Sequence, residues 1–271
     1  QHLYTTLWSQ CKPTILTSGT LAAGDGFTNT SRLLGLGHGV PVRNLQVSSP
    51  FDYVHNCLLV LPSSSGKRKR METSNEQIAK QLCQLIEAAH GHALVLFTSY
   101  EQMGEVYELL KDALDLPILQ ARRGSQAVVE QFKQLANGVL LAGGSCWEGI
   151  DFPGDLVSLL VIVRLPFPVP DPVRKARREQ YPDLHSYIQA EIVPEMQQKL
   201  RQGFGRAIRT ENDSCAVAIL DPRAALDGRY HQSALDALPD GIPITTKIED
   251  IEPFLRAHKS PDYFFPNSEN H

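Results

Sequence analysis

Short apolar runs alternate with longer amphipathic stretches over most of this chain. The short runs are rich in Val, Ile and Leu and predict buried strands. They lie at residues 14–17, 57–61, 93–97, 117–119, 139–142, 157–163 and 215–220. The amphipathic stretches repeat their apolar residues at helical spacing and predict helices. These lie near residues 30–36, 74–90, 100–114, 126–135, 174–178 and 183–209, the last interrupted at Pro194.

Strands and helices that follow one another in this way predict βαβ units. We therefore expect an α/β fold with a mainly parallel sheet and helices on both of its faces. No internal repeat is evident, and the longest apolar run is far too short to span a bilayer.

Polar residues follow several of the predicted strands directly. Ser18 and Gly19 follow the first strand, Thr98 and Ser99 follow another, and Gly144 and Ser145 a third. Ligands of parallel sheets bind beyond the carboxyl ends of the strands, so we expect these residues to share one rim. The hydroxyls of residues 98–99 and the start of the next helix would suit a phosphate. Ser99 would equally suit a plain helix N-cap.

A second polar cluster lies in the octapeptide from Gln202 to Arg209. If this is the end of a helix, Arg206 and Arg209 share one face with Gln202, an arrangement that suits anionic oxygens such as those of a triphosphate. An exposed helix end with cations near its C-terminus fits the octapeptide alone about equally well.

The stretch from Gly144 to Asp155 leaves two further alternatives open. Glu148 and Asp151 could form an acid–base pair or ligate a metal. Trp147 could stack on a base or lie buried. Nowhere does the chain contain a Gly-x-x-x-x-Gly-Lys-Ser/Thr loop.

The charge of the chain restricts how it could bind nucleic acid. The net charge is −4 over 271 residues, so binding would have to come from local patches. Two candidates are the cations at 67–70, which fit a solvated loop better, and the basic face around Arg174 and Arg178. Five scattered Cys residues and no visible signal peptide predict a reducing, cytoplasmic location.

Taken in order, four stretches resemble the motifs of the second half of a superfamily 2 DNA helicase of the DinG/XPD-like branch. Residues 18–20 resemble motif III, 97–100 motif IV, 144–151 motif V and 202–209 motif VI, while 164–172 is similar to a segment typical of the DinG side. The resemblance spans about residues 13 to 223 and departs from the family at Gly19, where Ala is usual. It implies one RecA-like motor domain over 1–271, with helical additions at about 165–200.

The resemblance also implies roles for individual residues. They are Gln202, Arg206 and Arg209 in catalysis; Glu148, Gly149, Asp151 and Gly205 at the nucleotide; Thr98, Ser99, Tyr100, Gly144, Ser145, Trp147, Arg174 and Arg178 at DNA; and Ser18, Gly19 and Thr20 in coupling. It implies ATP and Mg²⁺ held mainly by an N-terminal ATP-binding domain that this chain lacks. That domain could also carry an iron–sulfur cluster; we expect no metal site in this chain.

The partners implied are single-stranded DNA, ATP and the N-terminal helicase domain, with no membrane. We expect the full-length protein to be an ATP-dependent DNA helicase and this chain alone to be inactive.

The alternatives are a RecA-like binding module without an ATPase role, or half of a DinG-like nuclease. The pair Arg206 and Arg209 favours the helicase, because a binding module does not need it. A metabolic enzyme that uses a nucleotide would need a Gly-rich phosphate loop, which the chain lacks.

Overall fold

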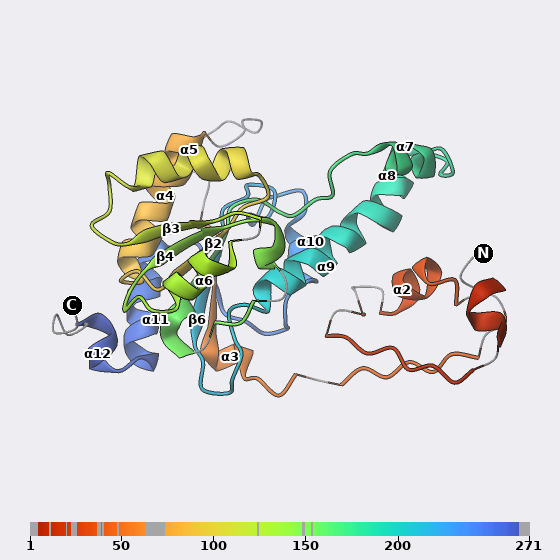
Figure 1. Cartoon of the computed structure of the whole chain (residues 1–271), viewed down its shortest axis with the longest axis horizontal. Helices are drawn as coiled ribbons and strands as arrows, with labels where there is room; N and C mark the ends of the chain where they lie inside the picture. The colour runs from red at the N-terminus through yellow and green to blue at the C-terminus, as the bar shows by residue number, and fades with distance from the viewer. Residues whose placement is uncertain are drawn as a thin grey trace.

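Seven parallel strands form the centre of the protein in the computed structural model (Figure 1). The structure describes residues 5–10, 12–19, 21–22, 26–36, 39, 41–47, 49–62, 74–123, 125–147, 150–152 and 154–265. The strands are β1 Cys57–Val60, β2 Ala93–Leu96, β3 Ile118–Ala121, β4 Val139–Ala142, β5 Leu159–Ile162, β6 Cys215–Ile219 and β7 Ile244–Thr245, in the order β3-β4-β2-β5-β6-β1-β7. The expected parallel α/β fold is confirmed.

The sheet is covered on both faces, as its continuous apolar strands require. In β2 every residue is buried, and its side chains alternate between two cores, Leu94 and Leu96 in one, Ala93 and Val95 in the other. The first core is closed by α6 Gln126–Phe132, α9 Val193–Phe204 and α10 His231–Leu235. The second is closed by α4 Asn75–Ala88, α5 Tyr100–Leu110 and α11 Ile251–His258.

Local sequence explains where the helices begin. Ser74 caps α4 by accepting a hydrogen bond from the N–H of Gln77 at 3.3 Å.

Outside residues 172–192, the other helical elements are short: η1 Trp8–Gln10, α2 Thr28–Leu33, α3 Tyr53–Asn56, η2 Gly144–Trp147, η3 Gly154–Val157, η5 Ile248–Asp250 and α12 Pro261–Phe264. In the part of the chain that the structure describes, no helix is both long and apolar enough to cross a bilayer.

Residues 172–192 form an arm that projects away from the sheet (Figure 1). It contains α7 Pro172–Arg178, α8 Leu184–Tyr187 and a π-helical segment, η4 Ile188–Ile192, which runs directly into α9. Pro194 occupies the first turn of α9, where a missing N–H is tolerated, so the helix is not broken there.

Two expectations were wrong, and one strand was missed. Residues 14–17 are extended but pair with no described strand, and Ile15 is 92% exposed. An apolar run forms a strand only where a neighbouring strand accepts its hydrogen bonds. The long helix ends at Phe204, five residues before Arg209. The two-residue strand β7 was missed because so short a segment has no periodicity of its own.

Candidate functional site

The carboxyl ends of β2 and β4 bring two of the predicted stretches into contact. The ring of Tyr100 lies so close to Gly143 and Gly144 that a Cβ on Gly144 would stand 2.2 Å from the tyrosine oxygen. Gly144 also has a φ of +57°, a conformation that L side chains rarely adopt. Thr98, Ser99 and Gly144 are exposed at this rim, and the side chain of Ser145 lies outside the described part of the structure. The expected proximity of residues 98–100 and 144 is therefore present.

Ser99 is the N-cap of α5, as one of the two interpretations held. Its hydroxyl accepts a hydrogen bond from the N–H of Gln102 at 3.3 Å. The hydroxyl of Thr98 is exposed beside it. The start of α5 thus presents one capped turn and one exposed hydroxyl toward solvent.

Trp147 is a core residue in this structure. Its side chain is 1% exposed, and Nε1 donates to the carbonyl oxygen of Phe97 at 2.9 Å. The buried indole ring has no exposed face on which a DNA base could stack. Of the two interpretations of Trp147, burial is therefore the one that the structure supports. The indole instead ties the loop after β4 to the end of β2.

A glycine on α9 packs against this indole. A Cβ on Gly203 would stand 2.7 Å from Cε3 of Trp147 and 3.2 Å from Leu96 Cδ1. Glycine is required here because helix, indole and strand meet without room for a methyl group. Gly203 therefore fixes how closely the end of α9 approaches the rim.

We expect Gly203→Ala to destabilise the fold by about 1–3 kcal/mol, because both neighbours are buried and cannot yield. Gly19→Ala is the matched control, since a Cβ there meets nothing within 4 Å, and it should change stability by no more than about 0.5 kcal/mol. Urea unfolding measures both. Equal stability of the two variants would show that α9 can shift freely.

Arg206 and Arg209 converge on one point beyond the rim. Arg206 Nη1 donates to the carbonyl oxygen of Ile150, and Arg209 Nη2 donates to the same oxygen at 3.1 Å. Arg209 Nε lies 3.2 Å from a carboxylate oxygen of Asp151, whose side chain is 74% exposed. Two guanidiniums and one carboxylate from stretches far apart in sequence thus form a single polar cluster, the arginine site.

The turn after α9 holds this site in place although it is not helical. Asp213 accepts hydrogen bonds from the N–H of Arg209 at 2.7 Å and of Thr210 at 2.8 Å. Gln202, Gly205, Arg206 and Arg209 are each partly exposed, while Ala207 and Ile208 are buried. Arg206 and Arg209 therefore lie side by side because of this turn, and not because they share one face of a helix.

Several expected site residues are not gathered here. Ser18 and Gly19 are exposed on the extended N-terminal segment, and since residues 14–17 form no strand of the sheet, their expected clustering on the rim was wrong. Thr20, Glu148 and Gly149 lie outside the described residues, as do the cations at 67–70.

The basic face of α7 lies on the arm rather than on the rim. Arg174 is committed to a bidentate pair with Glu195, with both N–O distances at 2.7 Å, and its Nε lies 3.1 Å from Asp171. These partners raise the pKa of Arg174 and hold its guanidinium in place. Arg178 is exposed.

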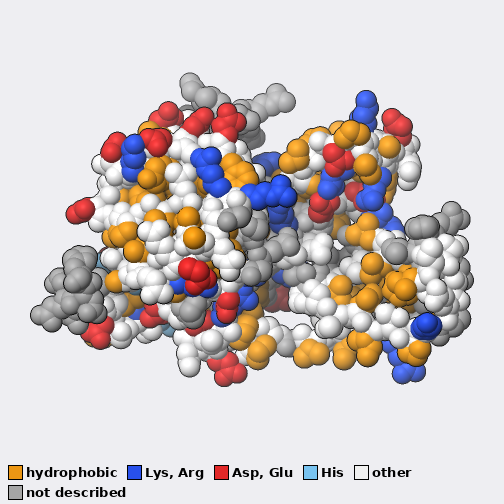
Figure 2. All heavy atoms as spheres, viewed as in Figure 1, with side chains coloured by type: hydrophobic (Ala, Val, Ile, Leu, Met, Phe, Trp, Pro, Cys, Tyr) orange, Lys and Arg blue, Asp and Glu red, His pale blue; other side chains and the backbone are white. Residues whose placement is uncertain are grey.

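Two cations at the rim were missed. Arg122 and Arg123 directly follow β3, which pairs with β4, and both are exposed. The guanidinium of Arg122 lies over Gly104 of α5, where a Cβ would stand 3.2 Å from Nη2. Figure 2 shows Lys and Arg side chains in the middle of this face and on the arm. A pair of arginines shortly after the predicted strand at 117–119 was the available signal.

A buried ion pair anchors the loops at the other end of this rim. Asp221 follows β6, is 1% exposed and forms a bidentate pair with Arg223. It also accepts the N–H of Leu165 at 2.8 Å, and Arg223 stacks over the ring of Phe167 at 4.6 Å. Burial alone would raise the pKa of Asp221, but the hydrogen bonds and charge of Arg223 lower it below its usual range.

Comparison with known proteins shows the class to which this chain belongs. The chain belongs to the helicase C-terminal domain family, whose pattern matches residues 82–241. It is 35% identical over 244 residues to the ATP-dependent DNA helicase DinG of Photobacterium profundum, covering 86% of this chain and 35% of that protein. It is 36% identical over 232 residues to the ATP-dependent DNA helicase YoaA of Haemophilus influenzae, covering 83% and 35%.

Other similarities point to the same branch of the family. A solved XPD helicase structure aligns with a TM-score of 0.53 at 26% identity, over 70% of this chain and 35% of that one. A Bacillus subtilis relative, 30% identical over 257 residues covering 90% of this chain and 27% of that protein, is named 3′-5′ exonuclease DinG. The chain spans about a third of the length of the curated relatives it matches.

Proposed function

We propose that this chain is the second motor domain of an ATP-dependent DNA helicase and supplies arginine fingers to a triphosphate bound mainly by an N-terminal domain. The observation that carries this proposal is the arginine site. Two guanidiniums held by a backbone carbonyl, with Asp151 beside them, offer several N–H donors to phosphate oxygens and need little rearrangement.

The residues of the arginine site take different roles in this proposal. Arg206 and Arg209 stabilise the charge that spreads over the transferred phosphoryl oxygens, and Gln202 contacts the γ-phosphate. Asp151 orients Arg209 and, with residues 148–149, the ribose or the attacking water. Mg²⁺ bound with ATP would supply positive charge to the phosphate oxygens. Among the described residues no group of three or more acidic, His or Cys side chains is suited to a metal. We propose that the N-terminal domain supplies most of the protein ligands of Mg²⁺.

The rim is the proposed contact with single-stranded DNA. The exposed hydroxyl of Thr98, the capped start of α5 at Ser99 and Tyr100, and the close backbone at Gly144 and Ser145 suit phosphate oxygens. Arg122 and Arg123 add positive charge on the neighbouring strand, and exposed Arg178 extends the path onto the arm. Trp147 is left out of this proposal because it is buried.

We expect the removal of rim and arm cations to lower DNA affinity in proportion to the number removed. In the full-length protein, Arg122→Ala with Arg123→Ala should weaken single-stranded DNA binding and lower the slope of log affinity against log salt by about 1.4, roughly 0.7 for each phosphate contact. Arg178→Ala should lower the slope by about 0.7, and Arg256→Ala, paired with Glu252 on α11, should not change it. Unchanged slopes in the first two variants would show that these cations are only solvated.

The name of the Bacillus subtilis relative favours a second candidate, a nuclease. The two candidates share the arginine site only if the nuclease also hydrolyses a nucleotide. End-labelled single-stranded DNA incubated with the full-length protein separates them, since a nuclease shortens the strand and a helicase leaves its length unchanged.

A further inference from the structure

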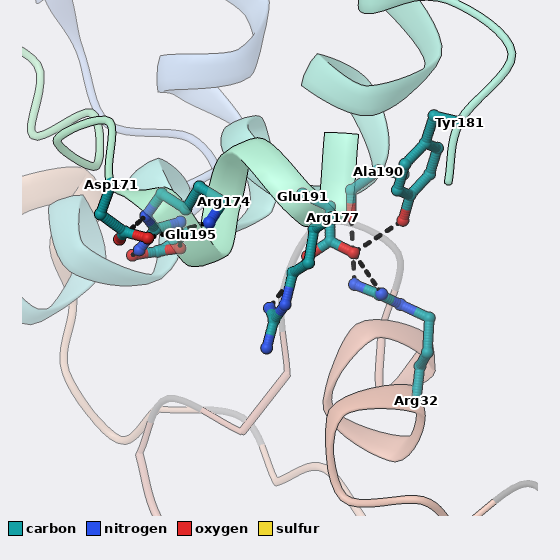
Figure 3. Close-up of polar contacts among 8 residues, drawn as sticks. All are labelled: Arg32, Asp171, Arg174, Arg177, Tyr181, Ala190, Glu191 and Glu195. Atoms are coloured by element: carbon teal, nitrogen blue, oxygen red, sulfur yellow. Dashed lines mark hydrogen bonds and ion pairs between the residues drawn. The ribbon is translucent and has the colours of Figure 1, made fainter. Parts of the chain in front are cut away.

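The segment that contains Ala22 and α2 contacts the continuous helix formed by η4 and α9, which leads to the arginine site. Arg32 on α2 forms an ion pair with Glu191 of η4, although 159 residues separate them in sequence (Figure 3). Tyr181 and Arg177 point at the same carboxylate from the arm. These four side chains are called the Glu191 cluster.

Glu191 is an unusual place for a charge because its side chain is only 9% exposed. Tyr181 donates its hydroxyl to Oε1 at 2.6 Å, and Arg177 Nη1 lies 3.6 Å from Oε2. Burial alone would raise the pKa of Glu191, but the hydrogen bonds from Arg32 and Tyr181 and the nearby guanidiniums lower it. A buried carboxylate that stays charged depends on its partners, so α2 is held where Arg32 can reach it.

The backbone beneath the cluster adds a second reason for Arg32 to bind there. Pro194 has no N–H to offer to the carbonyl of Ala190 four residues earlier. Arg32 Nη2 lies 3.4 Å from that carbonyl oxygen. The π-helical turn and the proline thus present a carboxylate and a carbonyl together, and one guanidinium bridges both.

A second fastening point lies further along the same helix. Arg201 of α9 donates to the carbonyl oxygen of Ala22, four residues beyond Ser18, and to those of Ala237 at 3.2 Å and Asp236 at 3.3 Å. Thr30 Oγ1 donates to the carbonyl oxygen of Leu21 at 2.5 Å, which closes the segment between the two points. The segment is therefore joined to the helix at two points, Arg32 and Arg201.

The helix carries this connection to the arginine site. η4 runs into α9 without a break, and α9 ends directly before the turn that holds Arg206. Arg201 is the neighbour of Gln202, and from Glu191 to Gln202 the helix spans about 17 Å. This continuous helix contacts Arg32 at Glu191 and carries Gln202 near its other end. It therefore links α2 physically to the arginine site.

We propose that the ion pair of Arg32 and Glu191 couples the segment that bears Ser18 and Gly19 to the arginine site and to Gln202; this inference rests on the proposed helicase function. Both are positioning residues, since neither touches the nucleotide. Loss of the pair should leave the site assembled but poorly linked to the state of the N-terminal segment.

The test uses Glu191→Gln and Arg32→Ala in the full-length protein. Glutamine keeps the size of the side chain and an acceptor for Tyr181 but removes the charge. ATP turnover without DNA should stay within about twofold of wild type, while the stimulation by single-stranded DNA should fall about tenfold. The double variant should be no worse than either single one, and Arg32→Lys should recover part of the stimulation. Glu252→Gln on α11, which removes a surface pair, should change neither rate.

Amide hydrogen exchange provides a readout that does not depend on activity. Exchange of the amides of residues 28–34 should rise about tenfold in Glu191→Gln, because α2 loses its ion pair with η4. The inference is overturned if exchange there is unchanged, or if basal and stimulated turnover fall by the same factor. If wild type itself shows no stimulation by DNA, the helicase proposal fails, and coupling to the arginine site fails with it. The exchange result then still reports whether the pair holds α2.

Discussion

Arg209→Ala should lower the DNA-stimulated ATP turnover of the full-length protein by about 10³–10⁵-fold, the range that an arginine finger contributes where it acts. Arg206→Ala should have an effect of the same order. Both guanidiniums donate to the carbonyl oxygen of Ile150, which places them side by side. The loss should appear in kcat more than in KM, because the charge that these groups stabilise develops in the transition state.

The chemistry of the replacement sharpens this prediction. Arg209→Lys should restore only part of the rate, because an ammonium group cannot make the forked pair of hydrogen bonds. The melting temperature should fall little, since the Arg209 side chain is 30% exposed and lies outside the core. Arg256→Ala, a surface arginine on α11, is the matched control and should retain full turnover. A variant at 209 that fails to fold, or turns over at the rate of wild type, would show that this arginine is structural.

Asp221→Ala should destabilise the folded protein strongly, by about 3 kcal/mol. It removes the acceptor of two backbone N–H groups, those of Leu165 and Arg223, and breaks a bidentate pair. We take the lower end of the range for a broken buried pair, because Arg223 is 46% exposed and can turn toward water. Glu252→Ala breaks a surface pair and should cost no more than about 1 kcal/mol.

The pH dependence of this pair has a definite sign. The pKa of Asp221 is lower in the folded protein than its ordinary value, so its charged form favours folding. Its contribution is complete above about pH 4, the usual unfolded pKa, and is lost as the pH falls through the lower folded pKa. The stability difference between wild type and Asp221→Asn, measured by urea unfolding, should therefore narrow below about pH 4. A difference that grows toward acid would contradict this account.

The sequence predicted the sheet because buried parallel strands leave an unmistakable pattern. Residues 93–97 and 139–142 are continuous apolar runs, residues 157–163 are apolar except for Ser158, and each run contains a strand. Residues 14–17 have two apolar residues between two β-branched threonines, but no neighbouring strand among the described residues. The hydrophobic pattern shows which side chains a segment could bury. Whether the segment becomes a strand also depends on a neighbouring strand with which it can form hydrogen bonds.

The candidate site was predictable in its residues but not in its contacts. Arg206, Arg209 and Asp151 do come together, although a turn after Phe204 rather than a helix places them. The burial of Trp147 depends on Gly203 of α9 and on Phe97, and the pairing of Arg174 depends on Glu195. Such contacts join residues distant in sequence, and nothing in local spacing indicates them. The pair of Arg32 and Glu191 is hidden for the same reason.

The measurement that tests the central claim most directly is the binding of a transition-state analogue. The full-length protein with single-stranded DNA should bind ADP with aluminium fluoride and Mg²⁺ at least about 10²-fold more tightly than ADP alone. The double variant Arg206→Ala, Arg209→Ala should bind ADP as wild type does but lose most of that added affinity, and this chain alone should bind the analogue no better than ADP. Equal affinity of wild type and double variant for the analogue would show that these arginines do not complete an ATPase site.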